Sequence, residues 1–377
     1  MPDLPANDRA ATGSSAHAAP ALRIVVMGTG PFAVPMFERL LASRHRIVAL
    51  VTRPDRAPAG RRPPPNPMLA AAEAAGVLVL APDRINDPAA IEAVRGLAPD
   101  LLVVCDYGQI LSPAALGVAA YGGVNLHGSL LPRHRGAAPV QWAILAGDAV
   151  SGVSVIHMSP ALDAGHVLAT AETPIGATET AAELEPRLAR LGAEIVPGAI
   201  DQLVQGGPGA TPGVPQDPAA VTRAPRLAKA DGIVDWSLPA ARIERMRRGL
   251  EPWPRATAFL HADGAEATSR APLRVVLEDV AVADAPAEEG RAVEGSEGSA
   301  VKGSAADGSA ATPVPGTILA ADPAGILVAC GDGTRLVIRR LVPEGRRSMS
   351  AAEFLRGHAL FAAARFGPPG ETTHPSK

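Results

Sequence analysis

The chain has 377 residues, a length that fits about two domains. Hydrophobic residues make up 47% of it and aromatic residues only 3%, so the core must be built mainly from Ala, Val, Leu and Ile. The formal net charge of −3 does not by itself indicate a nucleic-acid-binding protein. Two widely separated cysteines, Cys105 and Cys330, exclude a disulfide framework and a cysteine-based metal site.

The N-terminal residues 1–21 mix Ala, Ser, Pro and Asp without a continuous apolar stretch, which excludes a secretory signal. No apolar run reaches the length of a membrane-spanning helix. We therefore expect a cytoplasmic protein without membrane contact, in which residues 1–21 are a disordered extension.

Apolar segments alternate with helical patterns through the first half of the chain. The strand candidates are residues 22–27, 47–52, 77–80 and 101–105. This alternation predicts a Rossmann-like α/β domain over residues 22–205, in which a parallel sheet is covered on both faces. Ligands of such sheets bind beyond the carboxyl ends of the strands, so the chemistry is expected there.

The second half follows a different pattern. Gly and Pro are frequent at the start of residues 206–228, which predicts a linker. Short apolar runs with Gly and Asp turns follow, and they predict a small OB-like β-barrel domain over residues 229–366. Residues 284–313 are rich in Gly, Ala, Ser and Glu, so we expect a flexible acidic insertion there. Residues 367–377 form a tail.

A possible dinucleotide motif follows the first strand. Residues 28–33 read Gly-Thr-Gly-Pro-Phe-Ala, which matches the relaxed pattern G-x-G-x-x-G/A. Because Pro35 has no N–H group, we expect the helix to begin later, with Pro35 in its first turn. The turn would then lack the aligned backbone amides that bind a phosphate group. A tight turn is therefore the favoured interpretation. Arg53 would suit a 2′-phosphate, so an NADP-binding oxidoreductase stays open as an alternative.

The segment from residue 123 to 139 is rich in Gly and Pro and carries an amide and an imidazole two positions apart. Asn125 and His127 should project to one face where a strand ends, and Asp163 lies in a later turn that could reach the same edge. An amide can stabilise an oxyanion, an imidazole can move a proton and a carboxylate can orient the imidazole, a set that suits acyl transfer to an amine. The nine histidines form no metal-binding motif. An Asn-x-His pair is also common in turns and cores, so the residues alone leave both interpretations open.

Three segments are similar to the signature of the folate-dependent formyltransferases: Asn125-Leu-His-Gly-Ser-Leu-Leu-Pro132, residues 135–139 and residues 162–165. The resemblance extends over residues 22–366. It implies that the amide, imidazole and carboxylate above are the catalytic residues, that 10-formyltetrahydrofolate is the formyl donor, and that no metal is required. The resemblance also implies the residues that line the folate site, which are Ser129, Leu130, Leu131, Pro132 and Tyr107.

Members of this family differ in the amine that accepts the formyl group. Residues 226–236 and 251–254 are similar to the members that formylate methionyl initiator tRNA. Charge independently favours an RNA partner, because residues 223–260 hold eight Lys or Arg against four Asp or Glu, and residues 335–366 hold seven against two. The main alternative acceptor is an amino-sugar nucleotide, because that branch of the family shares a related second domain. A non-catalytic RNA-binding protein is a third possibility, and the catalytic trio argues against it.

Basic residues indicate where a tRNA would bind. The irregular loop 53–65 resembles the family segment that contacts the acceptor end of the tRNA, which implies Arg61 and Arg62 as contacts. Lys229, at the start of the second domain, is expected to be another. Asp106 departs from the family pattern, in which a small apolar residue is usual, and this affects the expected shape of the folate pocket. We expect a monomer.

Overall fold

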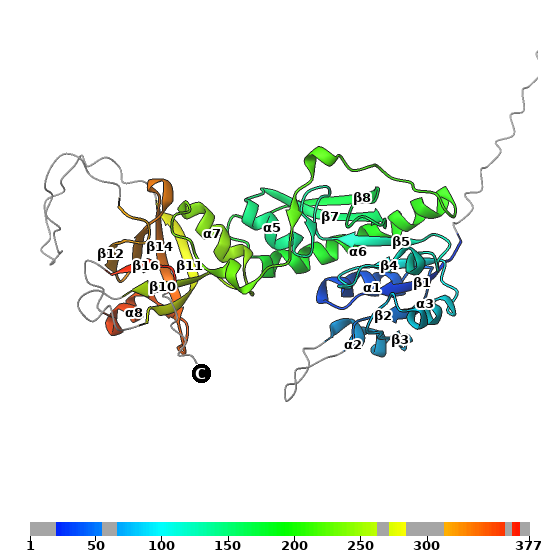
Figure 1. Cartoon of the computed structure of the whole chain (residues 1–377), viewed down its shortest axis with the longest axis horizontal. Helices are drawn as coiled ribbons and strands as arrows, with labels where there is room; N and C mark the ends of the chain where they lie inside the picture. The colour runs from blue at the N-terminus through cyan, green and yellow to red at the C-terminus, as the bar shows by residue number, and fades with distance from the viewer. Residues whose placement is uncertain (1–19, 55–65, 262–270, 284–312, 359–363, 370–377) are drawn as a thin grey trace, which may run out of the picture.

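The computed structural model describes residues 20–54, 66–261, 271–283, 313–358 and 364–369, which build two bodies that lie side by side (Figure 1). Three predictions concern residues that lie wholly or almost wholly outside these ranges. They are the disordered N-terminal extension, the flexible acidic insertion, and the tRNA contacts of Arg61 and Arg62.

A seven-stranded sheet forms the centre of the first body, with the strand order β3-β2-β1-β4-β5-β7-β8. In β1, Ile24 and Val26 contribute to one hydrophobic cluster and Val25 and Met27 to another, so the sheet is buried on both faces. The strands are β1 (Arg23–Met27), β2 (Arg46–Val51), β3 (Val79–Leu80), β4 (Leu101–Val104), β5 (Gly123–His127), β7 (Val150–His157) and β8 (Val167–Pro174). The predicted Rossmann-like α/β class is confirmed.

The sheet is parallel from β3 to β5 and antiparallel in its last two strands. The predicted parallel sheet accounts for the strands from β3 to β5, and the antiparallel pairs beyond them were not predicted. For β7 and β8 the reason is the short connection of residues 158–166, because a short connection can join neighbouring strands only when they run in opposite directions. The same connection carries Asp163 back to the end of β5.

Helices cover both faces of this sheet (Figure 1). The longest, α6 (Ala181–Gly206), begins in a capping box in which Thr180 and Glu183 satisfy each other's backbone amides. Its apolar side packs on α1 and on the β7–β8 hairpin. The other helical elements are η1 (Pro31–Ala33), α1 (Val34–Leu41), α2 (Pro67–Ala74), α3 (Pro88–Arg95), α4 (Pro113–Leu116) and α5 (Pro139–Ala146).

The turn after β1 uses its own amides internally. Helix α1 begins at Val34 and has Pro35 in its first turn, as predicted. Gly28 N donates to Val51 O at 3.0 Å, and Thr29 N donates to Asp106 O at 3.1 Å. These amides are therefore not free to hold a pyrophosphate, which favours the tight-turn interpretation of residues 28–33 over dinucleotide binding.

The second body is a curled antiparallel sheet with the order β12-β13-β14-β11-β10-β16, and β15 pairs with β14 (Figure 1). Trp236 and Phe366 stack in its core with ring centroids 5.1 Å apart. This half-barrel confirms the predicted OB-like class. Its strands are β10 (Thr257–His261), β11 (Leu273–Ala283), β12 (Ile318–Asp322), β13 (Gly325–Ala329), β14 (Arg335–Pro343), β15 (Met349–Ser350) and β16 (Arg365–Gly367). Its helical elements are η3 (Lys229–Gly232), α7 (Ala240–Gly249), η4 (Gly331–Gly333) and α8 (Ala351–Gly357).

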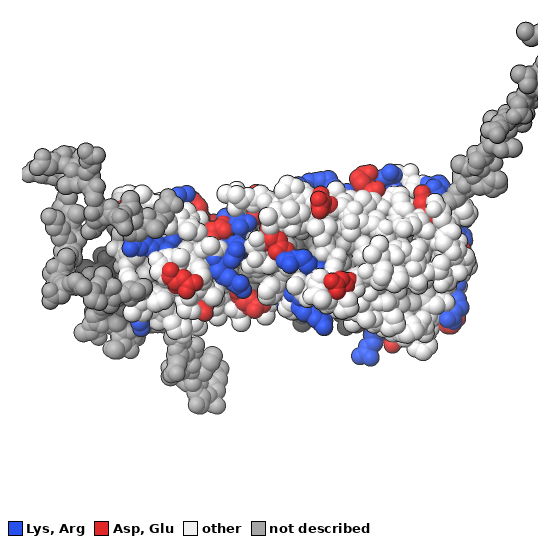
Figure 2. All heavy atoms as spheres, turned by 90° about the horizontal axis from the view of Figure 1, so that it is seen from above, with Lys and Arg blue, Asp and Glu red and all other residues white. Residues whose placement is uncertain are grey.

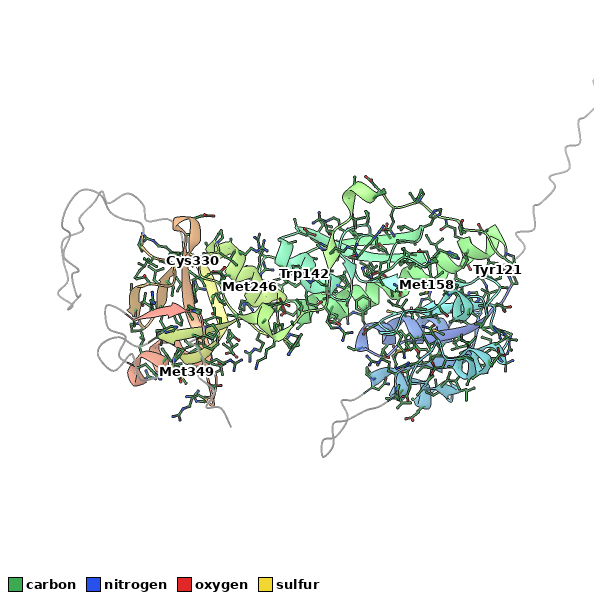
Figure 3. The ribbon with its side chains drawn as sticks, in the orientation of Figure 1. Tyr121, Trp142, Met158, Met246, Cys330 and Met349 are labelled. Carbon is green, nitrogen blue, oxygen red and sulfur yellow. The ribbon has the colours of Figure 1, made fainter. Side chains whose placement is uncertain are left out.

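Helix α7 joins the two bodies by packing against α5. A small apolar cluster fills this junction, with Leu250 fully buried and with Trp142 and Met246 packed against it (Figure 3). The Trp142 indole also donates to Pro225 O at 2.9 Å. Among the described helices, none has the length and apolar character needed to cross a membrane.

Candidate active site

Strand β5 places two polar side chains at the carboxyl edge of the sheet. Asn125 lies opposite Val104 on one neighbouring strand and Ile156 on the other, and His127 lies opposite Ser154. The alternation of a strand turns both side chains to the same face, as predicted. His127 is only 6% exposed, whereas Asn125 is half-buried.

Asn125, His127 and Asp163 line one cavity with a volume of about 630 Å³. The apolar part of its wall includes Val104, Ile156 and Met158. Such a mixture of apolar walls and a few converging polar groups is typical of a small-molecule site. Within the described ranges, no group of three His, Cys, Asp or Glu side chains is arranged to hold a metal ion.

The two ring nitrogens of His127 have different partners. Nε2 lies 2.9 Å from the carbonyl oxygen of His134, and Nδ1 lies 3.9 Å from Oδ2 of Asp163. Because a carbonyl can only accept a hydrogen bond, Nε2 carries the proton, and the lone pair of a neutral ring is therefore on Nδ1. Burial lowers the pKa of His127, while the negative charge of Asp163 and the bond to His134 raise it.

Asp163 is held from two sides in a left-handed backbone conformation, with φ of 50°. Its Oδ2 accepts a hydrogen bond from Gly136 N at 2.9 Å. Gly136 itself has φ of 135°, and a side chain there would collide with the carbonyl oxygen of Ala224, so only glycine fits. The carboxylate is thus fixed beside Nδ1 of His127 by the loop that follows β5.

A second histidine–carboxylate pair lies next to the first and was missed in the sequence. His134, which is 5% exposed, has its Nε2 2.7 Å from Oδ2 of Asp148. The same carboxylate binds Arg133, and His134 N donates to Thr222 Oγ1 at 2.8 Å. His134 can be buried because Asp148 satisfies its ring inside the protein.

The residues expected to line the folate site separate into two groups. Tyr107 lines the cavity and is 2% exposed; its hydroxyl has no partner within the described part of the chain, and burial raises its pKa to about 12. The other four form the loop behind the trio and do not belong to the described lining of the cavity: Ser129, Leu130, Leu131 and Pro132.

That loop is held by hydrogen bonds to β7. Ser154 Oγ donates to Ser129 O at 2.8 Å and accepts from Leu131 N at 3.0 Å. Ser129 Oγ donates to Arg133 O at 2.7 Å. In this structure the segment therefore shapes the turn that carries the His134 carbonyl.

Three charged side chains also line the cavity: Asp106, which the sequence placed at the folate pocket, and Glu185 and Arg226, which it did not. Burial raises the pKa of Asp106 to about 6, against the lowering effect of Arg226. Burial and the charge of Asp106 also raise the pKa of Glu185. The Asp106 carboxylate lies so close to Gly30 that a side chain at that position would clash. This contact gives the second glycine of the turn a role unrelated to dinucleotides.

Lys229, expected to contact tRNA, is exposed at the start of η3.

Comparisons with known proteins agree with this architecture. A family model for formyl transferase matches residues 22–200, and a model for the formyl transferase C-terminal domain matches residues 226–359. The methionyl-tRNA formyltransferase of Rhodopirellula baltica is 43% identical over 362 residues, which cover 93% of this chain and 98% of that protein. The methionyl-tRNA formyltransferase of Citrifermentans bemidjiense is 39% identical over 343 residues, covering 90% and 94%.

Among solved structures, the N-formyltransferase of Helicobacter canadensis, in complex with folinic acid and dTDP-3-aminofucose, has a TM-score of 0.55 at 12% identity. The match covers 84% of this chain and 98% of that one. At this identity the likeness shows a common fold and carries no conclusion about the acceptor.

Proposed function

The chain belongs to the formyl transferase family, and from this premise we propose that it transfers the formyl group of 10-formyltetrahydrofolate to the α-amino group of methionyl initiator tRNA. The observation that carries the choice of acceptor is the similarity to two methionyl-tRNA formyltransferases over at least 90% of this chain, which includes the second body. An amino-sugar nucleotide is less well supported, because the sugar-modifying relative shares the fold at only 12% identity.

Asn125 is proposed to stabilise the oxyanion. When the amine attacks the formyl carbon, the carbonyl oxygen becomes negatively charged, and a preorganised N–H donor lowers the barrier. The Asn125 side chain lines the cavity, and its carboxamide makes no hydrogen bond to any other described residue. Its N–H groups are therefore free to donate.

His127 is proposed to move the proton. The attacking amine must lose a proton as the new C–N bond forms, and N10 of the folate must gain one as its bond to the formyl carbon breaks. The Nδ1 lone pair can take the first proton and return it to N10, which leaves the ring neutral after each turnover. The bond from Nε2 to His134 O supports this role, because it directs the basic nitrogen toward Asp163.

Asp163 is proposed to stabilise the imidazolium that exists between these two transfers. Its carboxylate lies 3.9 Å from Nδ1, close enough to favour the charged ring and far enough to leave room for a proton donor or a water molecule. The side chain is 10% exposed, so the attraction acts with little screening by solvent.

The tRNA is proposed to lie along the junction of the two bodies. Lys and Arg side chains gather there on the face shown in Figure 2, interspersed with Asp and Glu. Helix α7, which packs against α5 at this junction, carries the exposed Arg242. Phosphate contacts by such residues would make the affinity for tRNA fall as the salt concentration rises.

An enzyme that uses charged tRNA works where translation occurs, so we also propose a cytoplasmic location.

The test is a transfer assay with labelled 10-formyltetrahydrofolate and two competing acceptors, methionyl initiator tRNA and dTDP-3-aminofucose. We expect the label on the tRNA and no measurable label on the sugar nucleotide. Label on the sugar nucleotide alone would overturn the choice of acceptor and leave the family assignment standing.

A further inference from the structure

The segment that joins the two bodies is hydrogen-bonded to both loops of the proposed catalytic site. Val214 exchanges two backbone hydrogen bonds with Val167 at the start of β8, of 2.8 and 2.9 Å. Farther along, β9 (Arg223–Ala224) pairs in parallel with β6 (Arg135–Gly136), immediately after the loop that carries His134. Between these two attachments, residues 215–222 pass beside the catalytic residues.

Gln216 lies in the middle of this passage and bonds to both loops at once. Its Oε1 accepts from Nε and Nη2 of Arg135, at 3.0 and 2.7 Å. Its Nε2 donates to the carbonyl oxygens of Asp163 and Gly165, both at 2.8 Å. The half-buried amide thus uses its acceptor on the loop after β5 and both donors on the β7–β8 turn.

The bonds to the β7–β8 turn fall where the backbone most requires support. Asp163 occupies a left-handed conformation that a non-glycine residue adopts only at a free-energy cost, so surrounding contacts must hold it. The contact from Gly136 N holds its side chain, and the contact from Gln216 holds its main chain. Loss of the second contact would let the carboxylate move relative to Nδ1 of His127.

We propose that Gln216 is a positioning residue, which fixes Asp163 against His127 from the segment between the two bodies; this inference rests on the proposed catalytic role of Asp163. Gln216 does not belong to the described lining of the cavity, so its effect on catalysis passes through its contact with Asp163. A displacement of about 1 Å at a reacting group can lower the rate by about 10²-fold, which sets the scale of the expected effect.

Two substitutions separate the contacts of Gln216. Gln216→Met keeps the length of the side chain and removes all four hydrogen bonds. Gln216→Glu keeps the acceptor for Arg135 but places a carboxylate against two carbonyl oxygens. We expect kcat to fall by about 10–100-fold in both variants, with unchanged KM for folate and tRNA and with Tm lower by only a few degrees because of the lost hydrogen bonds. The matched control is Gln202→Met on the exposed side of α6, which should leave all four quantities unchanged.

A double-mutant cycle in single-turnover formyl transfer then tests the route through Asp163. The Gln216→Glu substitution should cost little further activity in the Asp163→Asn enzyme, because the group that it positions is already lost. Normal kcat in both Gln216 variants would overturn the inference, and so would recovery of full activity in Gln216→Glu or an additive loss in the double variant. Near-normal turnover of Asp163→Asn alone would instead refute the proposed catalytic role of Asp163.

Discussion

The loop after β5 connects two histidine–carboxylate pairs whose imidazoles are equally buried but whose distances and surroundings differ. In the pair of His127 and Asp163 the nitrogen and oxygen are 3.9 Å apart and face a cavity. In the pair of His134 and Asp148, seven residues along the loop, they are 2.7 Å apart and lie outside the described cavity wall. The first pair is open and the second is closed.

The difference follows from what else each carboxylate binds. Asp148 also bonds to Arg133, so two cationic or hydrogen-bonding partners already satisfy it. Asp163 accepts one hydrogen bond, from Gly136 N, and its carboxylate stays 3.9 Å from Nδ1 of His127, too far for a direct hydrogen bond. A closed pair contributes a net stabilisation, whereas an open pair retains a basic nitrogen that can still react. We infer that the closed pair holds the His134 carbonyl, which in turn orients the open pair.

The largest expected effect is on turnover when the open pair loses its imidazole. His127→Ala removes the proposed proton carrier, so kcat should fall by about 10²–10⁴-fold. Folding should be preserved, because the ring lines a cavity and does not fill the core. Single-turnover transfer with saturating substrates measures this, with His261→Ala in the second body as the control. Near-normal turnover of His127→Ala would exclude the proton-transfer role.

A smaller loss is expected when the oxyanion donor is removed. Asn125→Ala should lower kcat by about 10²–10³-fold, and Asn125→Asp, which has nearly the same size, should be no better because a carboxylate repels the oxyanion. Combining Asn125→Ala with His127→Ala should cost less than the product of the two single effects, because the groups act as one unit. If Asn125→Asp kept the native rate, the carboxamide would have no role as a donor.

The closed pair should affect stability more than turnover. Asp148→Asn weakens the bonds to His134 and Arg133, so the free energy of unfolding should fall by about 1–3 kcal/mol. The kcat should change far less than in His127→Ala. Urea denaturation of this variant, compared with the exposed Asp217→Asn, measures the difference. A large loss of kcat at unchanged stability would show that the second pair takes part in the chemistry.

The sequence allowed the open pair to be predicted, because its signals are local. Asn125 and His127 share a strand face through the period of two, and Asp163 lies in a turn between two strand patterns. The closed pair and Gln216 could not be found in this way. Asp148 follows helix α5, and Gln216 lies in a Gly- and Pro-rich segment that composition marks only as a linker. Both act through contacts set by tertiary packing.

The strand directions illustrate the same limit. Alternating strands and helices predicted the parallel part of the sheet, since long crossovers connect parallel neighbours. The β7–β8 hairpin has no helix between its strands, and the short connection of residues 158–166 was the signal that could have indicated antiparallel pairing. Two charged residues of the cavity, Glu185 and Arg226, could not be predicted for another reason, since they come from α6 and from the segment before η3.

The smallest expected effect concerns the pH at which turnover begins to fall. Burial lowers the pKa of His127 below its ordinary value of 6.5, and Asp163 opposes this shift. A neutral ring is needed to accept the proton, so turnover should be constant at neutral pH and fall as the pH drops through this lowered pKa. In Asp163→Asn the opposing charge is absent, and the acid limb of the remaining activity should move to still lower pH.

Asp106, with a pKa of about 6, and Glu185 face the same cavity, so the profile must also be measured in an Asp106→Asn background. If the acid limb shifts in Asp106→Asn and not in Asp163→Asn, the titrating group is the Asp106 carboxyl. That outcome would contradict the proposal that His127 accepts the proton.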